Sequence, residues 1–153
     1  MFVEFKCDNL KNAIIENYRD KIDKSFDGSE VTQEMMDKFD LLDLDNKGIT
    51  NLGGIEKATN LRLLYMGNNE VEDISPLKEC SKLEILDFHK NKVEDIWPLE
   101  GLRRLESLNI SYNNIKDVMA LNDIANIDSI NIKGTDIENK LPLRHIRFVK
   151  KIN

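Results

Sequence analysis

The sequence predicts an α/β solenoid, in which short parallel strands stack into a concave sheet behind an N-terminal helical cap. Apolar residues recur every 22 positions in an L-x-x-L-x-L pattern, which occurs five times from residue 39 and begins a sixth time. The three apolar positions of the pattern are held by Phe39, Leu61, Leu83, Leu105, Ile127 and Val149, by Leu42, Leu64, Leu86, Leu108, Ile130 and Ile152, and by Leu44, Met66, Phe88, Ile110 and Ile132. A fixed period of about 20–29 residues with this pattern is the signature of a leucine-rich repeat solenoid. Such coils form an extended surface for binding.

Length and charge favour one cooperative unit, with a cap over residues 1–38 and repeats over residues 39–153. The net charge is −6, and the last fourteen residues carry five Lys or Arg and no acid, so residues 1–139 carry −11. An acidic body disfavours nucleic acid as a partner, since such binding depends on phosphate contacts. No run of about 18 apolar residues is present, so no membrane span is expected.

The N-terminus and the cysteines bear on the compartment. The first residues lack the long apolar stretch and small-residue cleavage site of a secretion signal. Cys7 in the cap and Cys80 at the end of the second coil should lie too far apart for a disulfide, which needs Cα atoms within about 7 Å. Two free thiols fit a reducing compartment. We expect a cytoplasmic monomer as the chain stands, or a secreted or cell-surface protein if the chain is a mature fragment.

The N-terminal segment has the pattern of two helices. Residues 8–22 carry a helical apolar stripe with Asp8 as the expected cap, and residues 32–39 can form a second short helix capped at Ser29 or Thr32. These helices would cover the open apolar end of the stack, because terminal caps keep repeat arrays soluble.

Within a coil, polar residues at fixed positions predict the turns. An Asn follows three of the strands (Asn69, Asn91 and Asn113), where it can bond backbone groups of its own turn and of the next coil. Asn51, Asp73, Asp95, Asp117 and Asn139 share a second position and are expected to cap short turns. Pro76, Pro98 and Pro142 share a third, suited to the first residue of a short 3₁₀ or α turn on the convex side.

The last coil departs from the pattern. Lys140 stands where the other coils have an apolar residue, and Leu141 could replace it by a one-residue shift. Val149 and Ile152 would begin a sixth strand at an open edge. Lys150 and Lys151 either discourage pairing with another chain at that edge or form a site for an anionic partner.

The junction between cap and repeats resembles the internalin family of bacterial leucine-rich repeat proteins. Residues 42–56 (LDLDNKGITNLGGIE) and 58–61 (ATNL) are similar to the first internalin repeat, and residues 73–77 (DISPL) to its recurring convex segment. The cap carries further similarity at Phe5, Asn9, Leu10, Ala13, Ile14, Val31 and Thr32. The resemblance implies protein recognition through the concave face. Internalins usually add a secretion signal, an immunoglobulin-like domain and a surface anchor, none of which is evident in residues 1–153.

The concave face is the candidate site, because residues between the inward leucines point out of the sheet. Three rows are predicted across the coils: Leu41, Leu63, Ile85, Ser107 and Ser129; Asp43, Tyr65, Asp87, Asn109 and Asn131; and Asp45, Gly67, His89, Ser111 and Lys133, with Lys90 and Tyr112 just beyond. Exposed apolar and aromatic residues mark interfaces. The expected partner-binding residues are Leu63, Tyr65, Ile85, Asp87, His89, Asn109 and Tyr112. The alternatives are that the cap helices cover Leu41 and part of Leu63, or that the face has no role.

No pattern in the sequence indicates catalysis or a cofactor. The segment from Asp43 to Gly54 has Lys47 at a ligand position of a calcium loop and Gly54 at its twelfth position, where calcium needs a glutamate. His89 and His145 have no neighbouring cysteines, so no zinc site is expected. We therefore expect a non-enzymatic protein–protein interaction module without cofactor or metal. The alternatives are a fragment of a bacterial surface adhesin and an accessory or regulatory subunit of an intracellular enzyme.

Overall fold

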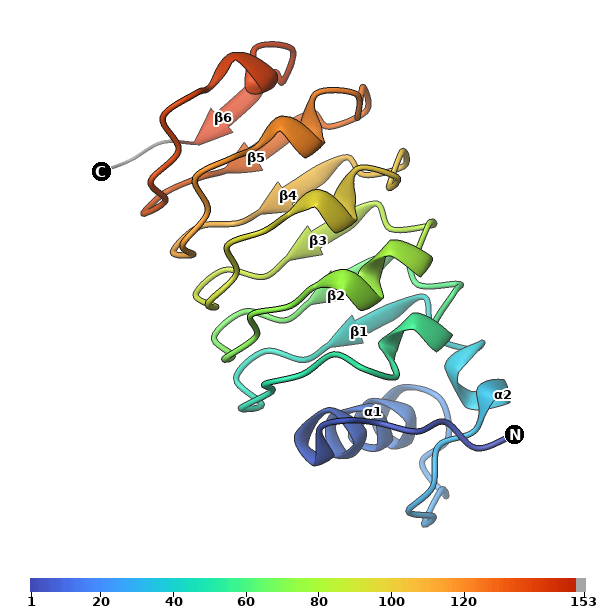
Figure 1. Ribbon diagram of the computed structural model, residues 1–153. Coiled ribbons are helices and arrows are strands. Elements are labelled where there is room, and N and C mark those ends of the chain that lie inside the picture. Colours follow the sequence, from blue (N-terminus) through green and yellow to red (C-terminus); the bar gives the residue numbers. More distant parts are fainter. Residues whose placement is uncertain (151–153) are drawn as a thin grey trace.

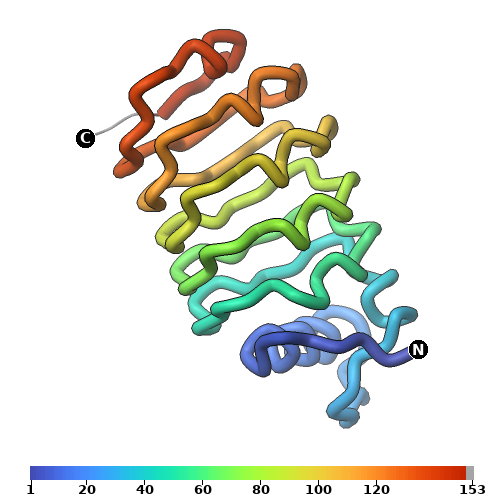
Figure 2. The backbone as a smooth tube through the Cα atoms, viewed as in Figure 1, coloured from blue at the N-terminus to red at the C-terminus, as the bar shows by residue number. Residues whose placement is uncertain are grey.

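Six short parallel strands form one sheet in chain order in the computed structural model, which describes residues 1–150 (Figure 1). The strands are β1 (Leu41–Asp43), β2 (Leu63–Tyr65), β3 (Ile85–Asp87), β4 (Ser107–Asn109), β5 (Ser129–Asn131) and β6 (Phe148–Lys150). The backbone trace repeats nearly the same loop in successive coils (Figure 2). The predicted solenoid is therefore confirmed. The expectations for Lys151 and Ile152 lie outside the described residues.

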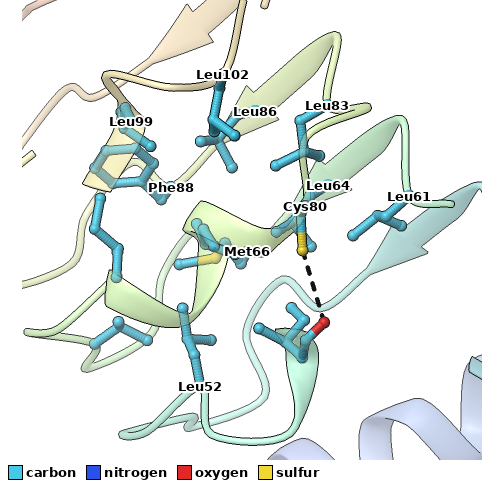
Figure 3. Packing of buried hydrophobic residues seen from close by; sticks show 14 of the residues in the cluster. Leu52, Leu61, Leu64, Met66, Cys80, Leu83, Leu86, Phe88, Leu99 and Leu102 are labelled. Carbon is cyan, nitrogen blue, oxygen red and sulfur yellow. Dashed lines mark hydrogen bonds between the residues drawn. The ribbon is translucent and has the colours of Figure 1, made fainter. Parts of the chain in front are cut away.

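The 22-residue apolar pattern builds one continuous core. The middle residues of β1 to β5 are at most 2% exposed, and the core extends from Val3 in the cap to Ile146 in the last coil. Side chains from neighbouring coils interleave between the strands and the convex turns (Figure 3). No coil buries its apolar face alone, so each is stabilised by its neighbours.

The convex side consists of short 3₁₀ helices of three to five residues. They span Ile55–Lys57, Ser75–Glu79, Trp97–Leu99, Met119–Leu121 and Leu141–Leu143. The predicted Asp and Asn caps are confirmed: each side chain accepts the backbone N–H two residues later, as from Trp97 to Asp95 at 2.8 Å. The three prolines lie at the second residue of their turns rather than the first.

A ladder of buried asparagines connects the coils. Asn91 donates to the carbonyls of Met66 and Phe88 at 2.9 and 3.0 Å and accepts from the Val71 N–H at 3.0 Å. Met66 and Val71 belong to the preceding coil, so the predicted bonds to the next coil run in the opposite direction. Asn69 and Asn113 repeat the pattern. These bonds satisfy backbone groups that no helix or long strand pairs.

The N-terminal cap closes the first edge of the sheet. Helix α1 (Asp8–Lys21) lies at the end of the stack beside β1 (Figure 1). Its buried Asn17 donates to the Asp43 carbonyl at 2.8 Å and accepts the Asp43 N–H at 3.1 Å, as a neighbouring strand would. Helix α2 (Gln33–Met36) begins after Thr32, whose hydroxyl accepts the Met35 N–H as predicted. Asp8 is not the cap of α1: Cys7 holds that position without a side-chain hydrogen bond, and Asp8 lies in the first turn.

The last coil breaks the 22-residue register. Ser107 pairs with Ser129, 22 residues later, whereas Ser129 pairs with Phe148, only 19 residues later. Val149 thus aligns with Ile130, the position that the period assigned to Ile152. Leu141 is 67% exposed and does not replace Lys140 in the core. The prediction for this coil was wrong because the buried Ile146 lies two residues before Phe148 of β6, whereas the equivalent Ile124 lies five residues before Ser129 of β5, so the last strand begins three residues early.

Both cysteines are free and buried. Burial, together with the charges of Glu56 and Glu79, raises the pKa of the Cys80 thiol to about 12. Desolvation also raises the pKa of Cys7, but backbone hydrogen bonds from Thr50, Leu10 and Asn51 outweigh it, so this pKa lies below its ordinary value. The thiolate is the reactive form of cysteine.

The two thiols should therefore differ in reactivity. At pH 8 a chromogenic disulfide reagent should react with Cys7 in the folded protein and with Cys80 only after unfolding in guanidinium. Cys7→Ser should remove the fast phase. Equal rates for both thiols in the folded protein would contradict the assigned environments.

The asparagine ladder predicts a second outcome. Asn91→Ala leaves three buried backbone groups unpaired, so the free energy of unfolding should fall by about 3 kcal/mol. Urea denaturation measures the change. Asn114→Ala, at an exposed position of the next coil, is the control and should change stability by less than about 0.5 kcal/mol.

Candidate functional site

The strand register brings two predicted rows together on the concave face. Tyr65, Asp87 and Asn109 pair across β2, β3 and β4, and Leu63 and Ile85 pair in the adjacent row. All five side chains are half-buried, because each stands on the sheet between its neighbours. The three-residue strands place these side chains two residues apart, so both rows face the same side of the sheet.

A shallow groove of about 520 Å³ runs along this face from β2 to β6. Among the predicted residues, Tyr65, Ile85, Asp87 and Asn109 line it, and Leu63 lies in the same row outside its wall. The other outward side chains of its wall are Ser107, Ser129, Asn131, Phe148 and Lys150. The side chains that line the groove are aromatic, apolar and acidic at β2 and β3, small and polar at β4 and β5, and aromatic and basic at β6.

Phe148 is the groove residue that the sequence pattern missed. It is 56% exposed, and the Arg147 guanidinium lies 5.2 Å from its ring centre. The 22-residue period assigned its row to residue 151, so only the shortened last coil reveals Phe148 on this face.

Asp87 is held by a network at the rim of the groove. One carboxylate oxygen accepts from the His89 N–H at 3.0 Å and contacts His89 Nδ1 at 2.7 Å, and the other accepts from Asn109 at 2.9 Å. His89 Nε2 lies 3.0 Å from the Asn68 amide nitrogen. A neutral ring that donates from Nδ1 and accepts at Nε2 satisfies both contacts. His89 thus positions Asp87 at the end of β3 and does not line the groove.

The His89 ring also fills the space over Gly67 in the preceding coil. A Cβ atom on Gly67 would overlap this ring, so a larger residue there would displace His89. The pairing of a glycine with a histidine one coil later was not apparent from the sequence pattern.

Tyr112 lies apart from the groove, in the turn after β4. It is 43% exposed, and the ammonium groups of Lys90 and Lys133 lie 6.0 and 5.7 Å from its ring centre. The 22-residue spacing places five left-handed residues in one row with φ between 51° and 65°: Asn46, Asn68, Lys90, Tyr112 and Gly134. Only Gly and Asn adopt this conformation readily, so Lys90 and Tyr112 are strained.

The first strand presents a separate, polar surface. A hollow of about 340 Å³ between α1 and the end of β1 is lined by Glu16, Asn17, Asp20, Lys21, Asp43, Asp45, Asn46 and Lys47. Leu41 is half-buried, as are Leu63 and Ile85. The Asn17 side chain of α1 bonds the backbone at the free edge of β1, so the helix continues the stack beyond the first strand.

Residues 1–150 contain no cluster of three or more His, Cys, Asp or Glu side chains arranged to hold a metal ion. Within the same range, no helix combines the length and apolarity that crossing a membrane requires.

The comparisons with known proteins agree with the repeat architecture. The family described as leucine-rich repeats (2 copies) matches residues 40–79 and 59–104. No curated protein matches the chain. Internalin InlF from Listeria monocytogenes strain 4b F2365 is 27% identical with a TM-score of 0.84, over 96% of this chain and 43% of the InlF chain. Internalin C2 from the same strain is 21% identical with a TM-score of 0.60, over 97% of this chain and 94% of that chain, and shows the fold alone.

The strained row gives a prediction for stability. Lys90→Asn should raise the free energy of unfolding by about 0.5–1 kcal/mol, because Asn tolerates the left-handed backbone that Lys90 adopts. Thermal and urea unfolding measure the change. The matched control is Lys92→Asn in the same turn, outside the positive-φ residues, which should not stabilise the protein.

Proposed function

We propose that this internalin-like leucine-rich repeat chain is a non-enzymatic module that binds a protein partner through the groove on its concave face. The observation that carries the proposal is the combination of Tyr65, Ile85 and Phe148 with a positioned Asp87 on the walls of one groove. Aromatic and aliphatic side chains that are partly or largely exposed, around a few oriented polar groups, are typical of interface centres.

The rigidity of the groove supports this proposal. Its walls stand on paired strands, and hydrogen bonds hold Asp87 on both carboxylate oxygens. A partner that docks on this surface need not order it first, so less of the interaction energy is lost to conformational entropy. Four strand steps separate Tyr65 on β2 from Lys150 on β6, about 19 Å at the spacing of paired strands. The partner therefore contacts several coils with one extended surface.

The charge distribution along the groove suggests the orientation of the partner. Asp87 lies toward its N-terminal end, whereas Lys150 and the Arg147 beside Phe148 lie at its C-terminal end. A partner surface with a basic end over β3 and an acidic end over β6 would complement it, which mainly affects the association rate and specificity.

A surface adhesin is the second candidate. Similarity to the Listeria internalin InlF favours it, and the chain spans 43% of the InlF chain. Protease treatment of intact cells followed by immunoblotting tests this candidate. Loss of the protein from intact cells would support a surface location, and protection until lysis would contradict it.

The concave site is tested with Tyr65→Glu combined with Ile85→Lys. Proteins retained by the unaltered chain are identified by mass spectrometry, purified and titrated by calorimetry. The double variant should bind the partner at least about tenfold more weakly, because a charged group at a desolvated interface centre is costly. Unchanged affinity would remove the concave face as the site.

The matched control is Lys78→Glu, an exposed charge reversal on the convex turn Ser75–Glu79. It should leave the affinity for the same partner unchanged. Circular dichroism of all variants separates a lost contact from a lost fold.

A further inference from the structure

Three large apolar side chains form an exposed row on the convex side. Trp97, Met119 and Leu141 are 51%, 44% and 67% exposed, and each is the first residue of the 3₁₀ helix in its coil. They are 22 residues apart, so they occupy one repeat position in three successive coils. The same position holds Gly53 and Ser75 in the first two coils. The one-turn helices that carry the row stack one above another opposite the sheet (Figure 1). We call these three side chains the convex stripe.

The caps of the turns hold the convex stripe outward. The backbone N–H groups of Trp97 and Met119 donate to Asp95 and Asp117 at 2.8 Å, and that of Leu141 donates to Asn139 at 3.0 Å. Two residues later, each turn buries a leucine in the core: Leu99, Leu121 and Leu143. Because one side of every turn is anchored in the core, the stripe cannot turn inward without breaking its coil.

The two flanks of the stripe carry different charges. Beside Met119, a hollow of about 750 Å³ is lined by Lys116, Asp117, Asp136, Glu138 and Asn139, so three carboxylates face one ammonium group. Beside Leu141, a hollow of about 690 Å³ on the other flank is lined by Arg103, Asn122, Asp123, Ala125, Arg144 and His145. An acidic flank therefore lies along one side of the stripe, and a mixed flank rich in arginine lies along the other.

We propose that the convex stripe is a second docking surface, which binds an amphipathic helical segment of a partner protein whose basic residues face the Asp117, Asp136 and Glu138 flank. A contiguous exposed apolar row rimmed by charges marks an interaction site, and tryptophan is among the residues most enriched at the energetic centres of interfaces. The acidic flank selects a basic edge on the partner.

The spacing of the stripe matches one face of a helix. Paired strands lie about 4.8 Å apart and the convex turns at least as far apart, so Trp97 and Leu141, two coils apart, are separated by at least about 10 Å along the stack. Residues i and i+7 of an α-helix are separated by about 10.5 Å. Apolar side chains at i, i+4 and i+7 can therefore each meet one member of the stripe.

Trp97 provides a direct readout, because it is the only tryptophan of the chain. The probe is a synthetic four-turn helical peptide without tryptophan, with leucines at i, i+4 and i+7, lysines along one side of that stripe and glutamines elsewhere. Titration of this peptide should shift the Trp97 emission to shorter wavelength, with a dissociation constant below about 100 µM. A peptide with glutamates in place of the lysines should bind at least about tenfold more weakly.

Variants of the protein test the location of the peptide. Leu141→Lys should weaken binding of the lysine peptide at least about tenfold, since this side chain is 67% exposed and its replacement spares the core. Thr59→Lys, at an exposed position on the first coil two coils before that of Trp97, is the control for the added charge and should leave binding unchanged. Tyr65→Glu should also leave it unchanged, so this surface is tested separately from the concave groove.

Three results would overturn the proposal. One is the absence of any Trp97 shift with the lysine peptide, and another is equal binding of the lysine and glutamate peptides. The third is a Trp97 shift that follows protein concentration without peptide and accompanies dimerisation in sedimentation, which would assign the stripe to a second copy of the chain.

Discussion

The hydrogen bonds between neighbouring coils are the interaction on which the rest of this structure depends. Each strand has three residues and each convex 3₁₀ helix has three to five, so a coil pairs only part of its backbone groups internally, as in the bond from the Leu77 N–H to the Ile74 carbonyl. Backbone bonds between coils, such as that from the Met66 N–H to the Asp87 carbonyl, and the ladder of Asn69, Asn91 and Asn113 supply the remaining partners. Apolar burial then follows, because the same stacking closes the core between strands and turns.

This constraint also explains the two ends of the stack. At the first edge, Asn17 of α1 presents one acceptor and one donor to Asp43 and thereby replaces a preceding coil. At the other end, Thr135 takes the place of the asparagine and bonds only the Ile132 carbonyl of its own coil. The coil that follows β5 is three residues shorter than the others. The irregular features of the structure thus lie at the first described coil, where α1 takes the place of a preceding coil, and at the coil of Thr135, which lacks the asparagine bonds to its neighbour.

The bonds between coils and the shared core hold the scaffold, so the identity of the outward residues is not fixed by packing. On the concave face this freedom yields a groove with Tyr65, Asp87 and Phe148, and on the convex face it yields the convex stripe. The two surfaces lie on opposite sides of the same coils, and the caps and ladder hold both in place. Both proposed surfaces are therefore presented by a scaffold that need not rearrange to expose them.

The sequence by itself determined the repeat length, the inward residues, the Asp and Asn caps, the ladder positions and the rows of the concave face. Each of these depends on contacts that recur at a fixed spacing, so the period reveals them. Only the tertiary structure decided the register of β6, the exposure of Leu141 and Phe148, the separation of Tyr112 from the groove, and the role of Asn17 at the first edge. These features depend on which coil lies next to a residue in space. The repeat period does not predict these spatial neighbours at the first and last described coils.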